Sequence, residues 1–330
     1  MFGLHFILAQ TRPASARRST QTLGVEKPVA VSADNARSAR KGLEVNRRDF
    51  LWCTPALLPC SSLARDAPIE PISRYESSTG GQIGLYAENV KTGETVTWRA
   101  DQRFVMCSTF KASLAACVLS RVDRSQDSLE QPIDFGAADM QDWWAPVAQA
   151  NLVKGALSVG EMCKAAVEQS DNTCASLLLS RIGGPAALTA YWRAIGDRET
   201  RLDDPEPYLN RTPLNGVRNT TTPAAMANIL RRIVLGKILS DSSRSKFTEW
   251  LIGCQTGKDR LRAGLPIDWM IANKTGNNGK DAAGDIAIVW PRPDVPIIIC
   301  VYTRGGQPTE RHFKVAFAGI GHFVAARLSV

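Results

Sequence analysis

Ser108-Thr109-Phe110-Lys111 opens a stretch of helical apolar spacing that runs to Val122, and three further boxes follow it at long intervals. Taken alone, this Ser-x-x-Lys box is weak evidence, because about one chance match is expected in a chain of this length. The ordered set of four is improbable by chance and indicates one shared active site. The other boxes are Ser170-Asp171-Asn172, Glu206-Pro207-Tyr208-Leu209-Asn210 and Lys274-Thr275-Gly276.

The first box places a hydroxyl and an amine on one helix. A serine at a helix start lies near the positive end of the helix dipole, which favours an oxyanion there. Lys111 is three residues further on, on the same helix face and within reach of Ser108. An N-cap serine beside a solvated lysine is the alternative, but it does not account for the other boxes. We therefore expect Ser108 to be the nucleophile, and Lys111, buried among cations, to have a lowered pKa that lets it act as a base.

The Glu206 box places a carboxylate four residues before an amide, in a loop bounded by proline. Glu206 and Asn210 can therefore share one water molecule, which Glu206 would deprotonate for attack on an acyl-Ser108 ester. A solvated loop glutamate is the alternative, but it leaves the Pro-x-Leu-Asn that follows without a reason. The sequence leaves open whether Glu206 or Lys111 is the base for acylation.

The Ser170 box precedes a predicted helix over residues 173–182. The Ser170 hydroxyl can relay a proton to a departing nitrogen, and Asn172 can form a hydrogen bond with a substrate amide. Asp171, between them, is expected to be a buried hydrogen-bonding strut instead of a catalyst.

From about Ile83 to the C-terminus, the sequence resembles a class A serine β-lactamase. Ser-x-x-Lys, Ser-Asp-Asn and Lys-Thr-Gly are the boxes of these enzymes and of the penicillin-binding proteins, which lack the Glu206 carboxylate. The resemblance implies an antibiotic-resistance hydrolase that opens the cyclic amide of penicillins and cephalosporins through an acyl-enzyme on Ser108. It implies a small-molecule β-lactam as the substrate, a monomer, and no cofactor.

The resemblance also implies roles for the remaining residues. The backbone N–H groups of Ser108 and Asn277 would form the oxyanion hole, and Lys274 and Thr275 would hold the substrate carboxylate. The catalytic set is then Ser108, Lys111, Ser170, Glu206, Asn210 and Lys274, and the substrate-binding set is Asn172, Thr275, Gly276, Asn277, Arg260 and Trp144.

Arg260 and Trp144 enter this set through departures from the commonest family pattern. Ala283 stands where many members carry an arginine that points at the substrate carboxylate, and Arg260 matches an alternative position for that arginine. Trp144 matches an aromatic gatekeeper at the cleft mouth. Cys107 matches a cysteine that carbapenem-hydrolysing relatives bridge to a second one, but the partner position is Asn278, so we expect no bridge. Hydrolysis of carbapenems is therefore left open.

The loop that carries Glu206 also departs from the family pattern. Family members commonly brace it with an Arg–Asp ion pair, at positions that are Asp204 and Asn219 here. Asp204 could instead pair with Arg218 or Arg211. We expect a loop that opens more easily and admits bulky oxyimino side chains, at some cost to deacylation.

Strand patterns at both ends of the chain enclose a helical middle. Residues 83–98 predict a hairpin, strand character returns at 285–290 and 296–302, and an amphipathic helix covers 308–328. This predicts a mixed α/β domain from residues 66–103 and 254–330 with an all-helical insertion, 104–253. The resemblance implies an antiparallel five-stranded sheet with flanking helices, and an active site in the cleft between the domains.

Residues 1–65 differ in composition from the rest of the 330-residue chain. Arg47-Arg48, a short apolar stretch over 51–58 and a small-residue exit predict a twin-arginine export signal and a periplasmic enzyme with no membrane segment in its mature form. Residues 1–67 carry +5 of the total net charge of +8, so the basic character does not indicate nucleic-acid binding.

Six cysteines lie beyond the predicted signal, and the sequence cannot choose among their 15 pairings. Export in the folded state favours buried free thiols, because folding would take place in the reducing cytoplasm. We expect no metal, since the three histidines, His5, His312 and His322, lack ligand spacing.

Two other functions share the acylation step. A peptidoglycan transpeptidase or carboxypeptidase would acylate but hydrolyse β-lactams slowly, and Glu206 and Asn210 argue against it. A β-lactam-sensing domain would acylate and signal, and the absence of an apolar run long enough to span a membrane argues against that.

Overall fold

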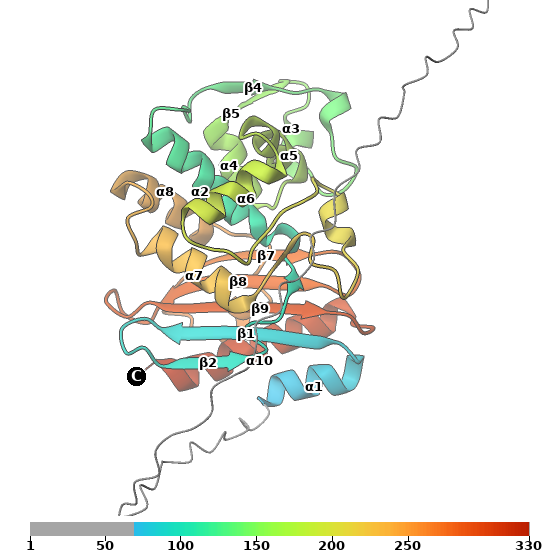
Figure 1. Ribbon diagram of the computed structural model, residues 1–330, viewed down its shortest axis with the longest axis vertical. Helices are drawn as coiled ribbons and strands as arrows, with labels where there is room; N and C mark the ends of the chain where they lie inside the picture. The colour runs from blue at the N-terminus through green and yellow to red at the C-terminus, as the bar shows by residue number, and fades with distance from the viewer. Residues whose placement is uncertain (1–68, 330) are drawn as a thin grey trace, which may run out of the picture. The chain divides into compact units, whose positions relative to one another are not determined.

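The computed structural model describes residues 69–329, and the predicted export signal lies outside them. A five-stranded antiparallel sheet is built from both ends of this part of the chain (Figure 1), in the order β2-β1-β9-β8-β7. This confirms the predicted mixed fold and its sheet. The strands are β1 (Gln82–Asn89), β2 (Thr95–Trp98), β7 (Met270–Asn277), β8 (Ala283–Trp290) and β9 (Ile297–Arg304).

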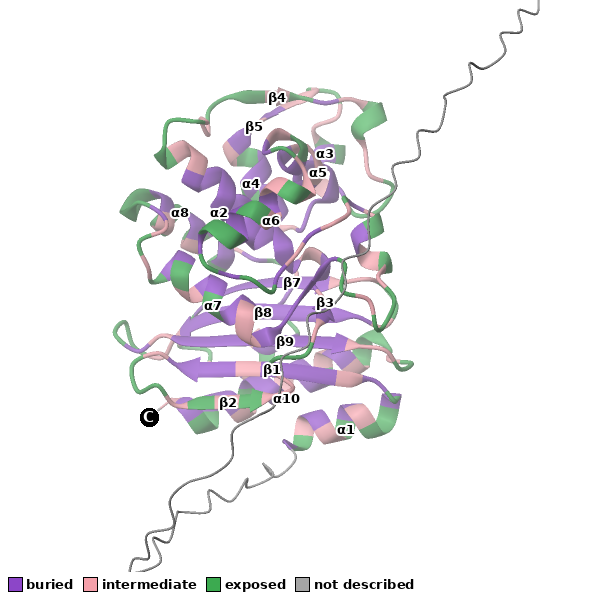
Figure 2. Ribbon diagram, viewed as in Figure 1, coloured by how far each residue is buried: buried purple, intermediate pink, exposed green. Residues whose placement is uncertain are grey.

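Helices cover both faces of the sheet, so its inner strands are buried nearly from end to end (Figure 2). Alternate residues of β8 belong to different cores, as the two-residue period of a strand requires. Ile286 and Ile288 pack with the helical region, whereas Ala287 and Val289 pack with the helices on the other face of the sheet. Those helices are α1 (Glu70–Thr79), α9 (Leu261–Gly264) and α10 (Glu310–Leu328).

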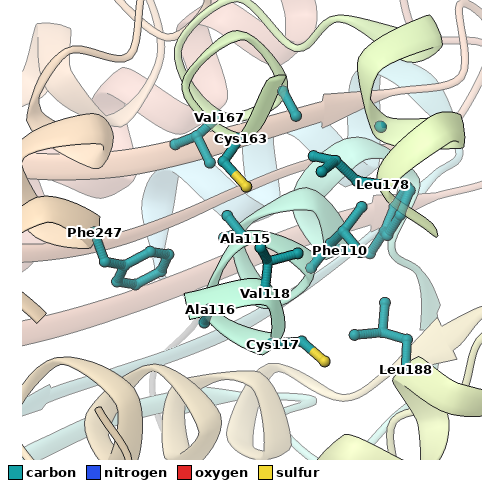
Figure 3. Close-up of a cluster of buried hydrophobic side chains, with 14 of the residues drawn as sticks. Phe110, Ala115, Ala116, Cys117, Val118, Cys163, Val167, Leu178, Leu188 and Phe247 are labelled. Carbon is teal, nitrogen blue, oxygen red and sulfur yellow. The ribbon is translucent and has the colours of Figure 1, made fainter. Parts of the chain in front are cut away.

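The middle of the chain folds around one buried helix, α2 (Phe110–Asp123). All its residues from Phe110 to Ser120 are buried, and Cys163, Leu178 and Phe247 of three other helices surround it (Figure 3). A helix buried on all sides holds its first turn rigidly, and that turn follows Ser108 directly. The other helices are α3 (Pro146–Ala150), α4 (Val159–Glu168), α5 (Asn172–Arg181), α6 (Pro185–Ala194), α7 (Pro223–Val234) and α8 (Asp241–Ile252).

Short elements connect these helices. The 3-10 turns are η1 (Cys107–Thr109), η2 (Ala137–Asp139) and η3 (Tyr208–Arg211). Strands β3 (Phe104–Val105) and β6 (Thr220–Thr221) pair with each other, as do β4 (Pro132–Asp134) and β5 (Ala156–Ser158).

Capping residues begin two of these helices. Ser158 and Glu161 form a reciprocal capping box at α4, and the Thr222 hydroxyl accepts the Ala225 N–H at α7.

The described residues, 69–329, all belong to one compact unit. The main-sheet strands lie outside residues 104–253, and α2 to α8 lie within them, but the division into two domains at these bounds stays a prediction. The cysteines of the described residues, Cys107, Cys117, Cys163, Cys174, Cys254 and Cys300, are free and buried, as predicted. Among residues 69–329, no helix is both long and apolar enough to cross a membrane.

Candidate active site

A cavity of about 330 Å³ lies where η1, the start of α5 and the edge strand β7 meet. It collects eight of the twelve predicted site residues: Ser108, Trp144, Ser170, Asn172, Arg260, Thr275, Gly276 and Asn277. The other four, Lys111, Glu206, Asn210 and Lys274, join it through contacts beneath its surface. Trp143, Thr256, Gly279 and Glu310 complete the lining.

The nucleophile candidate sits on a strained and tightly packed backbone. Ser108 is half-buried in η1. Cys107, the residue before it, has a backbone φ of +46°, which residues other than glycine rarely adopt. A Cβ on Gly276 would lie 2.8 Å from the Ser108 nitrogen. Glycine at this position of β7 therefore lets the sheet edge approach the Ser108 backbone closely, as a shared oxyanion site requires.

Lys111 is fully buried next to a carboxylate. Its Nζ donates to Ser170 O at 2.9 Å and to Asn172 Oδ1, and it lies 3.7 Å from Glu206 Oε1. Burial lowers the pKa of Lys111, and the nearby anions Glu206 and Asp171 oppose that shift. The predicted burial and direction are confirmed, but no cation is among the causes of the shift, so the predicted contribution from surrounding cations is wrong.

Ser170 lies between two buried lysines. Lys274 Nζ donates to Ser170 Oγ at 3.0 Å and to Thr275 O at 2.6 Å, while Lys111 bonds the Ser170 carbonyl. Burial lowers the pKa of Lys274 to about 7, and the charge of Lys111 adds to this. The Ser170 hydroxyl is therefore placed to exchange protons with an amine that can lose one near neutral pH.

Asp171 braces the cleft wall, as predicted. Its carboxylate accepts the N–H groups of Cys174, Val147 and Ala148 at 2.8, 2.9 and 3.0 Å. These bonds tie the start of α5 to α3, the helix that directly follows the tryptophan pair 143–144.

Asn172 and Trp144 belong to the same wall, but Asn172 is buried and Trp144 is exposed. The Asn172 side-chain amide donates to Trp143 O, and its backbone N–H donates to Trp144 O at 3.0 Å. Trp144 is 56% exposed, with its indole N–H bonded to Gln169 O at 2.7 Å. An anchored, exposed indole at the cavity rim agrees with the predicted gatekeeper position.

Glu206 and Asn210 form a buried pair at the base of η3. Asn210 Nδ2 donates to Glu206 Oε2 at 2.8 Å. Glu206 Oε1 and Asn210 Oδ1 are also buried, and neither accepts a hydrogen bond from residues 69–329. Two acceptors in this situation are rare in proteins, because each would cost about 1–3 kcal/mol if left unsatisfied.

The base of the Glu206 loop is braced in a different way from the family pattern. Asn219 Oδ1 accepts the N–H groups of Asp203 and Asp204, each at 2.9 Å, and Asn219 Nδ2 donates to Asp204 Oδ2 at 2.9 Å. Arg218 forms an ion pair with Asp204 at 2.6 Å, while Arg211 stacks on the Tyr208 ring. Of the two partners considered for Asp204, the structure therefore selects Arg218. Easier opening of the loop stays a prediction.

Arg260 reaches the cavity but is already engaged. Its guanidinium donates to Gly276 O at 2.9 Å and to Gly284 O at 3.3 Å, and it pairs with Glu310 at 3.2 Å. Glu310 also accepts a hydrogen bond from Asn277 Nδ2 at 2.9 Å. A substrate carboxylate would therefore share Arg260 with a protein carboxylate that sequence reasoning did not identify.

Three more cavity residues were missed. The Thr256 hydroxyl lies 2.5 Å from the Thr275 hydroxyl, and a Cβ on Gly279 would lie 3.8 Å from the Trp143 ring. For Trp143, the sequence offered one signal, namely that it stands next to Trp144. Glu310 has the sequence pattern of any acidic residue in the first turn of a helix, and Thr256 lies in no motif, so the sequence marks neither as a site residue.

Two expected absences concern the cysteine and the metal. Cys107 is free, and Asn278 Oδ1 accepts the N–H groups of Lys280, Asp281 and Ala282 at 2.9–3.0 Å. Within the described part of the chain, no group of three or more His, Cys, Asp or Glu side chains could hold a metal ion.

Comparison with known proteins agrees with this geometry. The model of the β-lactamase enzyme family matches residues 67–325. A carbapenem-hydrolysing β-lactamase KPC from Klebsiella oxytoca is 40% identical over 262 residues, which cover 79% of this chain and 87% of that protein.

Solved structures are similar over the same region. An ancestral class A β-lactamase of Gram-negative bacteria superposes with a TM-score of 0.75 at 44% identity, covering 78% of this chain and 99% of that one. A β-lactamase from Xanthomonas campestris superposes with a TM-score of 0.75 at 41% identity, covering 79% and 97%. With the four boxes gathered around one cavity, the chain belongs to the β-lactamase enzyme family, as a class A serine β-lactamase that hydrolyses cyclic amides.

Proposed function

We propose that this enzyme hydrolyses penicillins and cephalosporins through an acyl-enzyme on Ser108, which water activated by Glu206 then releases. The observation that carries the proposal is the buried Glu206–Asn210 pair. Glu206 Oε1 and Asn210 Oδ1 accept no hydrogen bond from the described residues, and Lys111 Nζ lies 3.7 Å from Glu206 Oε1. Acceptors of this kind bind ordered water, and a carboxylate that holds a water can remove its proton. Penicillin-binding proteins lack this carboxylate, which separates hydrolysis from transpeptidation.

In acylation, Ser108 Oγ attacks the lactam carbonyl carbon and forms an ester as the C–N bond breaks. The hydroxyl proton passes to Lys111 or Glu206, which lie 3.7 Å apart and both remain candidates. Ser170, bonded to Lys274, delivers its hydroxyl proton to the departing nitrogen and is reprotonated by Lys274. Lys274 recovers the proton that the base took from Ser108, so the base is deprotonated again before deacylation. The backbone N–H groups of Ser108 and Asn277 stabilise the oxyanion.

In deacylation, water attacks the ester carbonyl while Glu206 takes one of its protons. The C–O bond to Ser108 breaks, and the Ser108 oxygen recovers a proton from Glu206. The free enzyme is regenerated, and the product is the ring-opened amino acid.

Substrate binding rests on the cationic side of the cavity. Lys274, Thr275 and Arg260 hold the β-lactam carboxylate, and Asn172 binds the side-chain amide of the substrate. We include carbapenems among the substrates, because the KPC relative is named for hydrolysing them and Trp144 and Arg260 occupy this cavity.

Turnover of a chromogenic cephalosporin at low enzyme concentration tests the proposal. We expect many turnovers per enzyme and, with Ser108→Ala, no covalent penicillin adduct by mass spectrometry. A single stoichiometric burst from the unaltered enzyme would instead indicate a transpeptidase or a sensor. A stable adduct on Ser108→Ala would remove Ser108 from the nucleophile role.

We also propose twin-arginine export to the periplasm and a monomeric mature enzyme. The paired arginines Arg47 and Arg48 lie outside the described residues, and the sequence pattern alone supports this. Replacing both arginines by lysine should retain β-lactamase activity in the cytoplasmic fraction. Size-exclusion chromatography of the exported protein should give the mass of one chain.

A further inference from the structure

Asp285 is a fully buried carboxylate that the proposed mechanism does not use. It lies on β8, directly opposite Thr275 in the β7–β8 register, so the two side chains share one face of the sheet. Its Oδ1 accepts a hydrogen bond from Asn273 Nδ2 at 2.9 Å, and its Oδ2 accepts the Leu261 N–H at 3.2 Å. A carboxylate buried on a sheet next to the Lys-Thr-Gly box is costly and calls for a reason.

The segment Thr256–Leu261 lies over this face and supplies two cavity residues. The Thr256 hydroxyl meets the Thr275 hydroxyl, and the Arg260 guanidinium bonds the carbonyls of Gly276 and Gly284, the residue before Asp285. The Leu261 N–H bond to Asp285 fixes the backbone immediately after Arg260. Asp285 thereby determines where the segment, and with it the guanidinium, sits against β7.

Charge supports the same conclusion. Arg260 is 4% exposed and Lys274 is fully buried, so a guanidinium and an amine whose pKa is lowered to about 7 face one substrate carboxylate with little solvent to separate them. Asp285 is the fully buried anion that acts on both, since its own carboxyl feels the charges of Arg260 and Lys274. The groups that face Asp285 are Arg260, Lys274, Asn273, Cys300 and Tyr302, with Arg262 one bond further through Asn273 and Glu310 on the far side of Arg260.

We propose that Asp285 is a positioning residue for β-lactam recognition, which holds Arg260 in place to receive the substrate carboxylate. The inference rests on the proposed function, because it assigns a substrate carboxylate to Arg260. Asp285 touches neither the substrate nor the reacting atoms, and it acts through the Leu261 backbone and by raising the pKa of Lys274, which favours the protonated amine.

Protonation of Asp285 should weaken this support. Burial raises the pKa of Asp285 to about 6, although Asn273, Arg260 and Leu261 favour its ionised form. The carboxylate is ionised above that pH and neutral below it. Lys274, with a pKa of about 7, is already largely protonated below pH 6.5. The Michaelis constant for a carboxylate-bearing β-lactam should therefore rise as pH falls from 6.5 to 5 through the pKa of Asp285.

Asp285→Asn tests the assignment, because the amide is nearly isosteric and copies the neutral carboxyl. We expect KM for benzylpenicillin at pH 7.5 to rise about 3- to 10-fold, the scale of one net hydrogen bond, with kcat little changed. In the variant, KM should also no longer rise as pH falls through about 6, which we call the acid limb of the KM profile. The KM values of the variant and the unaltered enzyme should therefore converge near pH 5. An unchanged KM, or equal losses in kcat and KM, would overturn the proposal.

Two control variants separate positioning from general damage. Asp197 is another buried aspartate that accepts two backbone N–H groups, from Glu199 and Thr200, but it lies in the helical region. Asp197→Asn should lower the melting temperature and leave KM unchanged, whereas Asp285→Asn should change KM with a smaller loss of melting temperature. Glu310→Gln should keep the acid limb, and loss of the limb in this variant would assign the pH effect to Glu310 and refute the role of Asp285.

The unaltered enzyme provides an outcome even if Asp285→Asn does not fold. A KM that stays flat between pH 6.5 and pH 5, where Lys274 is already largely protonated, refutes the proposal, and a rise over that range that Glu310→Gln retains supports it. Failure of the proposed function would appear differently, as the absence of a Ser108 acyl adduct in the unaltered enzyme at any pH.

Discussion

The two walls of the cavity hold their reactive groups by different means. On one wall, Lys274, Thr275 and Gly276 lie on an edge strand whose register with β8 fixes every side chain. On the other wall, Glu206 lies in a loop that side-chain contacts close, with Asn219 and Arg218 at its base. The sheet wall should therefore tolerate single changes in its surroundings, whereas the loop wall should lose precision when one contact is removed.

The largest effect is expected on the loop wall. Glu206→Gln keeps the size of the side chain and its contact with Asn210 but removes the base, so acyl-enzyme should accumulate. Steady-state turnover should fall roughly 10²–10⁴-fold, the usual scale of general-base catalysis. Mass spectrometry during turnover of benzylpenicillin checks this, with Ser108→Ala as the control that forms no adduct. Turnover near that of the unaltered enzyme would remove Glu206 from the role.

The next effect concerns the sheet wall. Arg260→Ala should raise KM for penicillins by about 10- to 100-fold, because a charged hydrogen bond is worth about 1.5–3 kcal/mol. The backbone register of β7 should survive, so the acylation rate at saturation should change little. Steady-state kinetics and a melting curve measure both effects. Arg262→Ala is the matched control, because Arg262 donates to Ile271 O and Asn273 and does not line the cavity. Unchanged KM in Arg260→Ala would show that another cation holds the carboxylate.

A smaller effect is expected at the base of the loop. Asn219 has φ +57°, so alanine would add backbone strain to the loss of the amide, whereas Asn219→Gly removes the amide alone. We expect Asn219→Gly to slow deacylation by about tenfold, on the scale of one or two hydrogen bonds to buried backbone N–H groups. Hydrogen exchange across residues 200–220 should increase, and ceftazidime turnover should rise relative to benzylpenicillin. Unchanged exchange in that segment would contradict a bracing role for the amide.

The contrast between the walls also explains what the sequence could predict. Ser108, Lys111, Ser170, Asn172 and Lys274 lie on or next to regular elements, where a short motif fixes both residue type and geometry. Their positions in the cavity follow from helix and strand periods that the sequence displays.

Other features depend on contacts between distant segments. Glu310 binds Arg260, fifty residues earlier in the chain, and Asp285 on β8 accepts the N–H of Leu261 in α9. No local sequence pattern therefore marks Glu310 or Asp285. The lowered pKa of Lys111 could be predicted in direction, but its cause required knowing how deeply the helix is buried and that Glu206 lies beside it. The choice of Arg218 over Arg211 for Asp204 likewise depends on how the loop closes.

The smallest effect should come from Arg218, and it tests how far the loop wall depends on charge. The Arg218 side chain is 58% exposed, and its ion pair with Asp204 should contribute little, because solvent screens it. Arg218→Ala should therefore slow deacylation less than fivefold and should mimic the unaltered enzyme at high salt, where the pair is already screened. Arg211→Ala is the matched control, since it removes the same charge from the same loop without touching Asp204. Equal effects of the two variants would indicate a general loss of positive charge. A tenfold or larger loss of deacylation rate in Arg218→Ala, but not in Arg211→Ala, would mean that the Arg218–Asp204 ion pair closes the loop. The hydrogen bonds of the Asn219 amide would then contribute less than the ion pair.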